Sequence, residues 1–235
     1  MINNPIYEPK GKAKEYADLA LNIYTGCTHG CEYCYAPRVL RKTADEFKAV
    51  LPRKEIAESV KAQLSKGKIK NSLIHLCFAC DPYPTGVDTT VTREIIKTIK
   101  ESGNHVQILT KSTGVKRDLD LLDRNDWVGI TLSGDDNVEP YAASESERIE
   151  TIMAAKAKGI KTWISFEPVL DQLMVQSYIV GLKYIVDKVA VGKPSNYNAK
   201  ATYTTWREFG RQIEELCLTQ GTDYYIKDSL RAEMG

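Results

Sequence analysis

The sequence lacks long apolar runs. No stretch of about 18 consecutive apolar residues occurs, and a membrane-spanning helix needs roughly that length. Residues Met1–Lys14 are polar and basic, without the apolar segment of a secretory signal peptide. Repeats, linkers and low-complexity stretches are also missing. These absences predict a cytoplasmic protein that has no membrane partner and folds as a single domain over residues 1–235.

An excess of one charge sign is also missing over the whole chain, which has 32 Lys and Arg and 31 Asp and Glu. The charges are unevenly distributed, however, because residues 1–70 carry 13 Lys and Arg against 8 Asp and Glu, a net charge of +5. A basic segment predicts a polyanionic partner such as nucleic acid. Solvated lysine-rich helix faces give the same count, so charge alone leaves both interpretations open.

Short β-branched apolar segments alternate with longer amphipathic segments, a pattern typical of repeated βα units. The predicted strands are Leu19–Tyr24, Leu73–Cys80, His105–Thr110, Trp127–Ser133, Lys161–Phe166 and Lys188–Gly192, with a further candidate at Asp223–Lys227. The predicted helices are Pro37–Phe47, Lys54–Lys66, Thr92–Ser102, Arg117–Asp123, Ser144–Lys158, Gln172–Val186 and Thr205–Thr219. Six such units predict an α/β fold, a partial (β/α)6 TIM-like barrel in one domain, with a core over about residues 17–195 and a C-terminal helix and strand extension over residues 203–228.

Polar residues and cysteines follow the predicted strands. Right-handed crossovers bring the carboxyl ends of parallel strands to one rim, where barrel enzymes keep their chemistry. The segments at this rim are Cys27–Cys34, Cys80–Tyr83, Thr110–Ser112, Ser133–Asp135, Glu167–Pro168 and Gly192–Pro194. The sequence therefore predicts the functional site at this edge of the sheet.

Three of the six cysteines, Cys27, Cys31 and Cys34, lie in one loop after the first predicted strand. A given three-cysteine spacing is expected about 0.004 times by chance in a chain of this length and cysteine content. In a cytoplasmic protein, cysteines are typical of metal ligands, reactive thiols or core residues rather than disulfides. The spacing therefore indicates a metal site.

Three thiolates from one loop can bind three irons of a 4Fe–4S cluster, and Gly26 and Gly30 allow the backbone to wrap closely around it. The fourth iron then has no ligand from this loop. A zinc ion would instead need four ligands, with His29 as the nearest fourth candidate. A zinc loop or a buried thiol cluster is the alternative interpretation.

The Cys-x3-Cys-x2-Cys spacing, with Tyr33 before the last cysteine, resembles the signature of the radical S-adenosylmethionine (SAM) superfamily. Within it, Asn22–Arg38 is similar to the subfamily of spore photoproduct lyase and the DNA repair photolyase-like proteins. Further blocks follow in the same order as in that subfamily, at Cys80–Tyr83, Thr110–Ser112, Val128–Ser133 and Glu147–Ile160. The resemblance covers roughly residues 5–195.

This resemblance implies a 4Fe–4S cluster on Cys27, Cys31 and Cys34 whose open iron binds the amino and carboxylate groups of SAM. Reductive cleavage of SAM would give a 5′-deoxyadenosyl radical that abstracts hydrogen from a substrate. The resemblance also implies an electron donor such as flavodoxin or ferredoxin. It favours a nucleic-acid base as the substrate, in a lyase or modification reaction of DNA repair.

Four residues resemble cofactor-binding positions of the family. Tyr33 would contact the adenine, and Lys111 would meet the SAM carboxylate, because a cation suits that anion. Ser133 would contact the ribose or the carboxylate, and Arg148 would give another carboxylate contact. The structural alternatives are a packing tyrosine, a solvated lysine, a turn serine and a solvent-facing arginine.

Two residues are candidates for catalysis. Tyr35 resembles a tyrosine of the radical relay in the lyase, although a packing aromatic at a helix start is an equal alternative. Cys80 is either a hydrogen-atom donor or a residue that positions the backbone near SAM; the donor cysteine of the lyase lies on this strand but does not match it residue for residue. Cys77 and Cys80 also spell Cys-x2-Cys, but strand alternation would point them to opposite faces, which disfavours a second metal site and predicts Cys77 in the core.

Two other functions stay open. One is a radical SAM enzyme that acts on a peptide or a small metabolite, although the sequence has no auxiliary cluster motif, which weakens the peptide version. The other is an iron–sulfur or zinc binding module without catalysis. Fold resemblance alone does not decide among substrates, because one fold hosts many functions.

Overall fold

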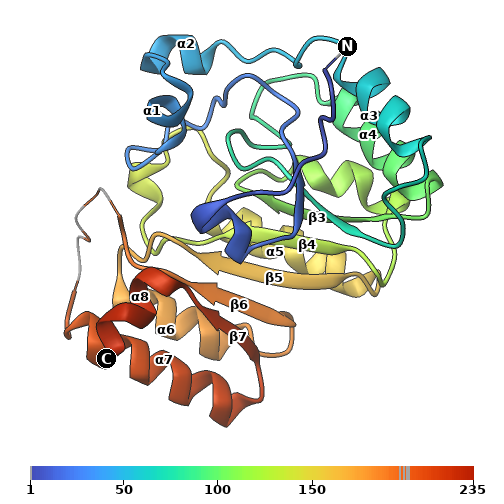
Figure 1. The fold of residues 1–235 in the computed structure, drawn as a ribbon. Helices are drawn as coiled ribbons and strands as arrows, with labels where there is room; N and C mark the ends of the chain where they lie inside the picture. Colours follow the sequence, from blue (N-terminus) through green and yellow to red (C-terminus); the bar gives the residue numbers. More distant parts are fainter. Residues whose placement is uncertain (1, 196, 198, 200–201) are drawn as a thin grey trace.

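One parallel β-sheet organises the chain in a computed structural model that describes residues 2–195, 197, 199 and 202–235. Its strands are β1 (Leu19–Leu21), β2 (Leu73–Leu76), β3 (His105–Thr110), β4 (Trp127–Thr131), β5 (Lys161–Phe166), β6 (Lys188–Val191) and β7 (Asp223–Ile226). Their order in the sheet is their order in the sequence, and each neighbouring pair is parallel. All carboxyl ends therefore lie at one edge, which confirms the predicted α/β fold of a partial TIM-like barrel (Figure 1).

The strand count differs from the prediction of six units. The further candidate at Asp223–Lys227 is β7, and it pairs in parallel with β6 after the crossover helix α7 (Trp206–Gln220). The sheet therefore has seven strands. The largest differences in strand length are at β1 and β2: β1 ends at Leu21, and β2 ends at Leu76 because Cys77 takes a left-handed backbone conformation with φ +69°.

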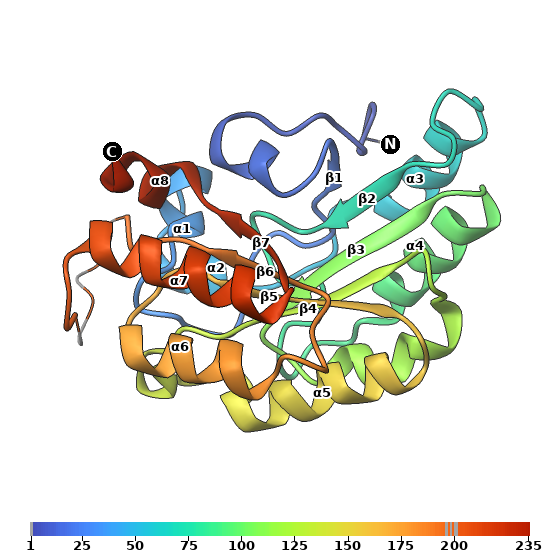
Figure 2. The same ribbon diagram turned by 90° about the horizontal axis from the view of Figure 1, so that it is seen from below.

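Helices cover the outer face of the curved sheet (Figure 2). They are α3 (Ile56–Leu64), α4 (Thr90–Glu101), α5 (Glu145–Ala157), α6 (Gln172–Gly181) and α7, while α8 (Asp228–Met234) follows β7 and packs on α7. Capping boxes begin α5 and α7, through Ser144 with Glu147 and Thr205 with Glu208. These caps bond backbone N–H groups that have no partner within the helix.

Two predicted helices are built differently. The helix expected over Pro37–Phe47 is split into α1 (Ala36–Leu40) and α2 (Ala44–Lys48), because Arg41 takes φ +54° and Thr43 starts a new capping box. The helix expected over Arg117–Asp123 is a 3-10 helix, η2 (Gly114–Leu121). A further 3-10 helix, η3 (Asp136–Val138), lies between β4 and α5. None of the helices over the described residues is both long and apolar enough to cross a bilayer.

The N-terminal segment lies across the open side of the sheet, between β1 and the β7–α8 region (Figure 2). It contains the 3-10 helix η1 (Gly11–Glu15). Lys227, directly after β7, is 1 % exposed and places its Nζ 3.5 Å from Glu15 and 3.2 Å from the backbone oxygen of Lys12. The open edge of the barrel is thus closed by an ion pair between the two ends of the chain.

The core contains one contact where only a glycine fits. Trp163 on β5 is 3 % exposed, and its indole N–H donates to the backbone oxygen of Ile108 on β3 at 3.0 Å. The intervening strand β4 passes beneath this ring at Gly129, where a Cβ would lie 2.2 Å from Trp163 Nε1. The indole ring of Trp163 can therefore pack in this position only because residue 129 has no side chain.

We expect Gly129→Ala to lower the free energy of unfolding by about 1–3 kcal/mol, because the added methyl displaces the buried indole. The measurement is a urea unfolding curve of the purified chain. Gly181→Ala at the end of α6 is the matched control, since a Cβ there meets no atom within 4 Å. It should change stability by less than about 1 kcal/mol; equal losses in the two variants would contradict the packing argument.

Candidate active site

The carboxyl ends of the strands enclose a cavity of about 770 Å³, which is the size of a typical small-molecule site. Its wall consists of the cysteine loop, the segments after β2, β3, β5 and β6, and part of the N-terminal segment. A smaller cavity of about 500 Å³ opens near the amino ends of the strands and is lined by none of the predicted site residues. The chemistry-bearing residues therefore gather at the edge predicted from the sequence.

The cysteine loop contacts the backbone of α2. The backbone N–H of Cys27 donates to the oxygen of Phe47 at 3.0 Å, and a Cβ at Gly26 would lie 1.9 Å from that same oxygen. Only glycine permits this approach. Within the loop, Gly30 has φ +68°, and the N–H of Cys34 donates to the oxygen of Cys31 at 3.1 Å. The loop path is therefore fixed by backbone contacts.

The thiols of Cys27, Cys31 and Cys34 are free and all line the cavity. Burial raises the pKa of each thiol, that of Cys31 to about 12. The charges of Cys31 and Cys34 add to the raised pKa of Cys27, whereas Lys111 acts in the opposite direction on Cys31 and Cys34. Without a bound cation these thiols stay protonated at neutral pH, and metal binding would release their protons.

The cysteine loop offers three thiols as metal ligands, a donor type that suits iron–sulfur clusters and zinc. Among the described residues, no group of three or more His, Cys, Asp or Glu side chains converges on one point that could hold an ion. Zinc requires such convergence, whereas thiolates of a cube each bind a different iron and need not share one. The ring of His29 faces Asp81, with Nδ1 3.5 Å from the carboxylate, and its other ring nitrogen, Nε2, is buried without a hydrogen-bond partner.

A buried carboxylate, Glu139, organises the wall beside the cysteines. It accepts hydrogen bonds from the hydroxyl of Tyr33 and from the guanidinium of Arg148, and Lys111 Nζ lies 3.6 Å away. Desolvation acts to raise the pKa of Glu139, but the charges of Lys111 and Arg148 and the two hydrogen bonds outweigh it, so the pKa is lowered. Glu139 is therefore ionised at neutral pH.

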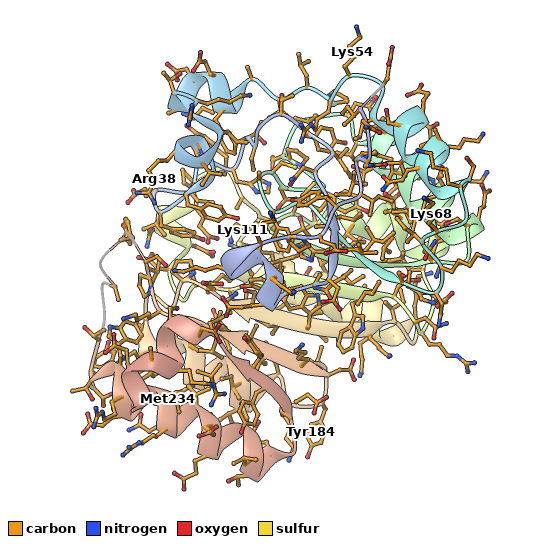
Figure 3. The ribbon with its side chains drawn as sticks, viewed as in Figure 1. Arg38, Lys54, Lys68, Lys111, Tyr184 and Met234 are labelled. Atoms are coloured by element: carbon orange, nitrogen blue, oxygen red, sulfur yellow. The ribbon has the colours of Figure 1, made fainter. Side chains whose placement is uncertain are left out.

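Lys111 lies near the centre of the view in Figure 3, whereas Arg38 of α1 lies near its edge. The Lys111 side chain is 14 % exposed, lines the cavity and passes over the Tyr33 ring with Nζ 5.5 Å from the centroid. Its backbone N–H donates to Asp81 at 3.0 Å. Lys111 thus presents an ammonium group to the cavity from a fixed backbone.

Arg148 and Ser133 lie differently from the prediction of direct cofactor contacts. Arg148 is fully buried, and its guanidinium bonds the backbone oxygens of Thr131 and Ala143 together with Glu139. Ser133 is also fully buried, and its N–H donates to the carboxylate of Glu145 at 2.6 Å. Neither residue lines the described cavity. Arg148 acts on the site through Glu139.

Both candidate catalytic residues line the cavity. The hydroxyl of Tyr35, in the residue after Cys34, donates to the backbone oxygen of Phe78 at 2.6 Å. Cys80 is half-buried. Cys77 is buried as predicted, yet it lines the same cavity, so the expectation that Cys77 and Cys80 point to opposite faces is wrong. The alternation rule fails because β2 has already ended at Leu76.

The sequence did not reveal two further groups at the site. Glu139 has no local signal, since its partner Tyr33 is 106 residues away. The second group is Tyr16, whose hydroxyl donates to Glu167 at 2.5 Å and whose ring carries Lys227 Nζ at 3.7 Å from the centroid. Burial and the Glu167 charge raise the pKa of Tyr16 well above its usual value. Tyr16, Glu167 and Lys227 line the cavity, whereas Glu139 does not and contacts the lining residues Tyr33 and Lys111.

Two solved structures share this fold. Spore photoproduct lyase complexed with dinucleoside spore photoproduct superposes with a TM-score of 0.69 at 13 % sequence identity, covering 94 % of this chain and 79 % of the lyase. SuiB of Streptococcus suis bound to S-adenosylmethionine superposes with a TM-score of 0.61 at 11 % identity, covering 88 % and 45 % of the two chains. Both are radical SAM enzymes, so the predicted relationship to that fold is confirmed.

The chain belongs to the family described as "Protein of unknown function (DUF5131)", which matches residues 12–231. An uncharacterized protein of Methanocaldococcus jannaschii is 31 % identical over 176 residues, which are 70 % of this chain and 65 % of that protein. An uncharacterized protein of Mycobacterium tuberculosis is 27 % identical over 169 residues, 65 % of this chain and 50 % of that protein. The chain therefore matches only part of the length of these relatives.

We expect Glu139→Gln to lower the free energy of unfolding by about 3 kcal/mol at neutral pH, because it removes the buried carboxylate that pairs with Arg148 and Lys111 and leaves Arg148 only the half-exposed Asp136. The pKa of Glu139 is lowered in the folded state. Its contribution to the free energy of unfolding is therefore complete above the ordinary pKa of a glutamate and is lost as the pH falls through the folded-state pKa. The difference between wild type and Glu139→Gln should therefore narrow below about pH 4. Urea unfolding across pH measures it.

The matched control is Glu150→Gln, whose carboxylate is 66 % exposed and only 3.8 Å from Lys116. Exposed pairs of this kind contribute about 0–1 kcal/mol, so its unfolding curve should follow that of the wild type. If the stability difference between the wild type and Glu139→Gln instead grew as the pH is lowered, the assigned direction of the pKa shift would be contradicted.

Proposed function

We propose that the chain is a radical SAM enzyme that binds a 4Fe–4S cluster and cleaves SAM. The observation that supports this most is that the three cysteines of one short loop open onto the same cavity as Lys111, at the carboxyl edge of the sheet. When bound, the cluster and SAM together supply a 5′-deoxyadenosyl radical for hydrogen abstraction. The protein residues hold, orient and shield these groups.

The residue roles follow from their places in the cavity. Cys27, Cys31 and Cys34 would each hold one iron, and the ammonium of Lys111 would bind the SAM carboxylate through a charge-assisted hydrogen bond. Glu139 lies 3.6 Å from the Lys111 ammonium, which it helps to hold beside the Tyr33 ring. Cys80 and Tyr35 line the cavity and are the candidates for the radical steps that follow hydrogen abstraction.

Anaerobic reconstitution should load about four irons per chain, and Cys27→Ala, Cys31→Ala or Cys34→Ala should each abolish loading, since three ligands are the minimum. Dithionite-reduced protein should then convert SAM to 5′-deoxyadenosine and methionine. Iron analysis and chromatography of the products measure the two results. Lys111→Ala should keep the iron but should raise the SAM concentration that is needed for half-maximal cleavage.

Cys217→Ala is the control, because Cys217 is buried in α7 and does not line the cavity. It should retain both iron and SAM cleavage. Stoichiometric zinc in place of iron would contradict the cluster. A fully loaded cluster whose spectrum never responds to SAM would leave a binding module without catalysis.

We further propose a nucleic-acid base as the substrate. The cavity is lined by several basic and several aromatic side chains, namely Lys10, Lys12, Arg38 and Lys193 together with Tyr7, Tyr35 and Tyr197. Cations suit phosphates, and tyrosine rings suit stacked bases. The solved lyase structure with dinucleoside spore photoproduct supports the same substrate class. An enzyme for a peptide or small metabolite is the competing proposal.

Binding to single-stranded DNA should weaken steeply with salt, because phosphate contacts release counterions. Single-stranded or distorted DNA should bind better than intact duplex, since a base must leave the stack to reach the cavity. Fluorescence anisotropy at several salt concentrations measures both. Arg38→Ala should lower the salt slope, whereas Lys68→Ala, far from Arg38 in Figure 3, should not. Salt-independent binding, or equal binding of neutral polymers, would remove nucleic acid as the partner.

A further inference from the structure

A second pair of cysteines lies in the cavity wall, apart from the three of the cysteine loop. Cys77 and Cys80 are the ends of the tight turn that follows β2, and both line the cavity. Cys77 is 5 % exposed, whereas Cys80 is half-buried. Burial raises the pKa of the Cys77 thiol, and the neighbouring Cys80 thiol raises it further. The two thiols are therefore neighbours on one short turn of the cavity wall.

The turn that brings the thiols together is held on both sides. The side-chain oxygen of Asn22 accepts the N–H groups of Phe78 and Ala79 at 2.9 Å each, and the N–H of Cys77 donates to the oxygen of Leu21 at 2.7 Å. Cys77 has φ +69°, a conformation that a residue with a Cβ seldom adopts. The surrounding hydrogen bonds compensate for this strain.

The same turn connects to both ends of the cysteine loop. Asn22 precedes the loop and holds the turn from one side, and Tyr35 follows the loop and donates to Phe78 within the turn. A change in bonding between Cys77 and Cys80 would therefore act on contacts of the proposed cluster site.

We propose that Cys77 and Cys80 are a redox-active dithiol that exchanges with small-molecule disulfides and closes into a disulfide in the cavity wall. Cys-x2-Cys spacing suits this chemistry. The more exposed Cys80 thiolate attacks the small disulfide, forms a mixed disulfide and expels one thiolate. Cys77, after losing its proton, attacks the Cys80 sulfur and expels the second thiolate. The protein dithiol is oxidised by two electrons and one small disulfide is reduced to two thiols.

The test is anaerobic incubation of the reconstituted protein with oxidised glutathione, followed by acid quenching, alkylation in denaturant and peptide mass analysis. The wild type should yield a Cys77–Cys80 peptide that has lost two hydrogen atoms, with alkylation of Cys80 reduced about tenfold. Cys77→Ser should instead retain one glutathione on Cys80, because no second thiol displaces it. Cys217 in the same digest is the internal control and should stay fully alkylated.

The same incubation with the Cys27→Ala/Cys31→Ala/Cys34→Ala variant separates this inference from the proposed function, because that variant cannot bind the cluster. It should give the same disulfide, so failure to load iron would leave the inference intact. The wild-type digest alone decides the outcome, even if Cys77→Ser does not fold. Glutathione that persists on Cys80, or two thiols that both remain alkylated, would overturn the redox pair.

Discussion

The buried carboxylate of Glu139 is the interaction on which the candidate site depends. It lies between Tyr33 of the cysteine loop, Lys111 after β3 and Arg148 of α5, and thereby connects three elements that the sheet alone would leave separate. A buried arginine without a carboxylate would be strongly destabilising, and so would a carboxylate without its cations. The ion cluster therefore specifies one arrangement of the wall and keeps the Lys111 ammonium in the cavity.

A comparable constraint closes the open side of the barrel. A sheet with strand order β1 to β7 has two free edges, and the side between them must be covered if the cavity is to exclude water. Lys227 after β7 reaches Glu15 and Glu167, and its ammonium lies over the ring of Tyr16. The N-terminal segment and the residue after β7 are therefore both parts of the cavity lining, although neither contains a recognisable motif.

The similarity to radical SAM enzymes of solved structure is a similarity of fold alone, because the sequence identity is only 11–13 %. The substrate must consequently be argued from side chains of this chain. Its cavity combines a basic and aromatic rim with a wall that contains five thiols, three on the cysteine loop and two on the turn after β2. The rim supports a polyanionic substrate, and the second thiol pair distinguishes the wall chemically from that of a site with cluster ligands alone.

The sequence by itself determined the fold class, the edge of the sheet that carries the site and the cysteine loop, because periodicity, strand ends and the spacing of Cys27, Cys31 and Cys34 are local patterns. Lys111 and Tyr33 were predicted as cofactor contacts from a family resemblance, and the structure places both in the lining of the cavity. Only the tertiary structure decided that Arg148 is buried against Glu139 and that Cys77 faces the cavity. These features could not be predicted, since one depends on a contact between residues on separate elements and the other on a left-handed residue that ends β2 early. Local patterns specify elements, whereas packing decides which side chains meet.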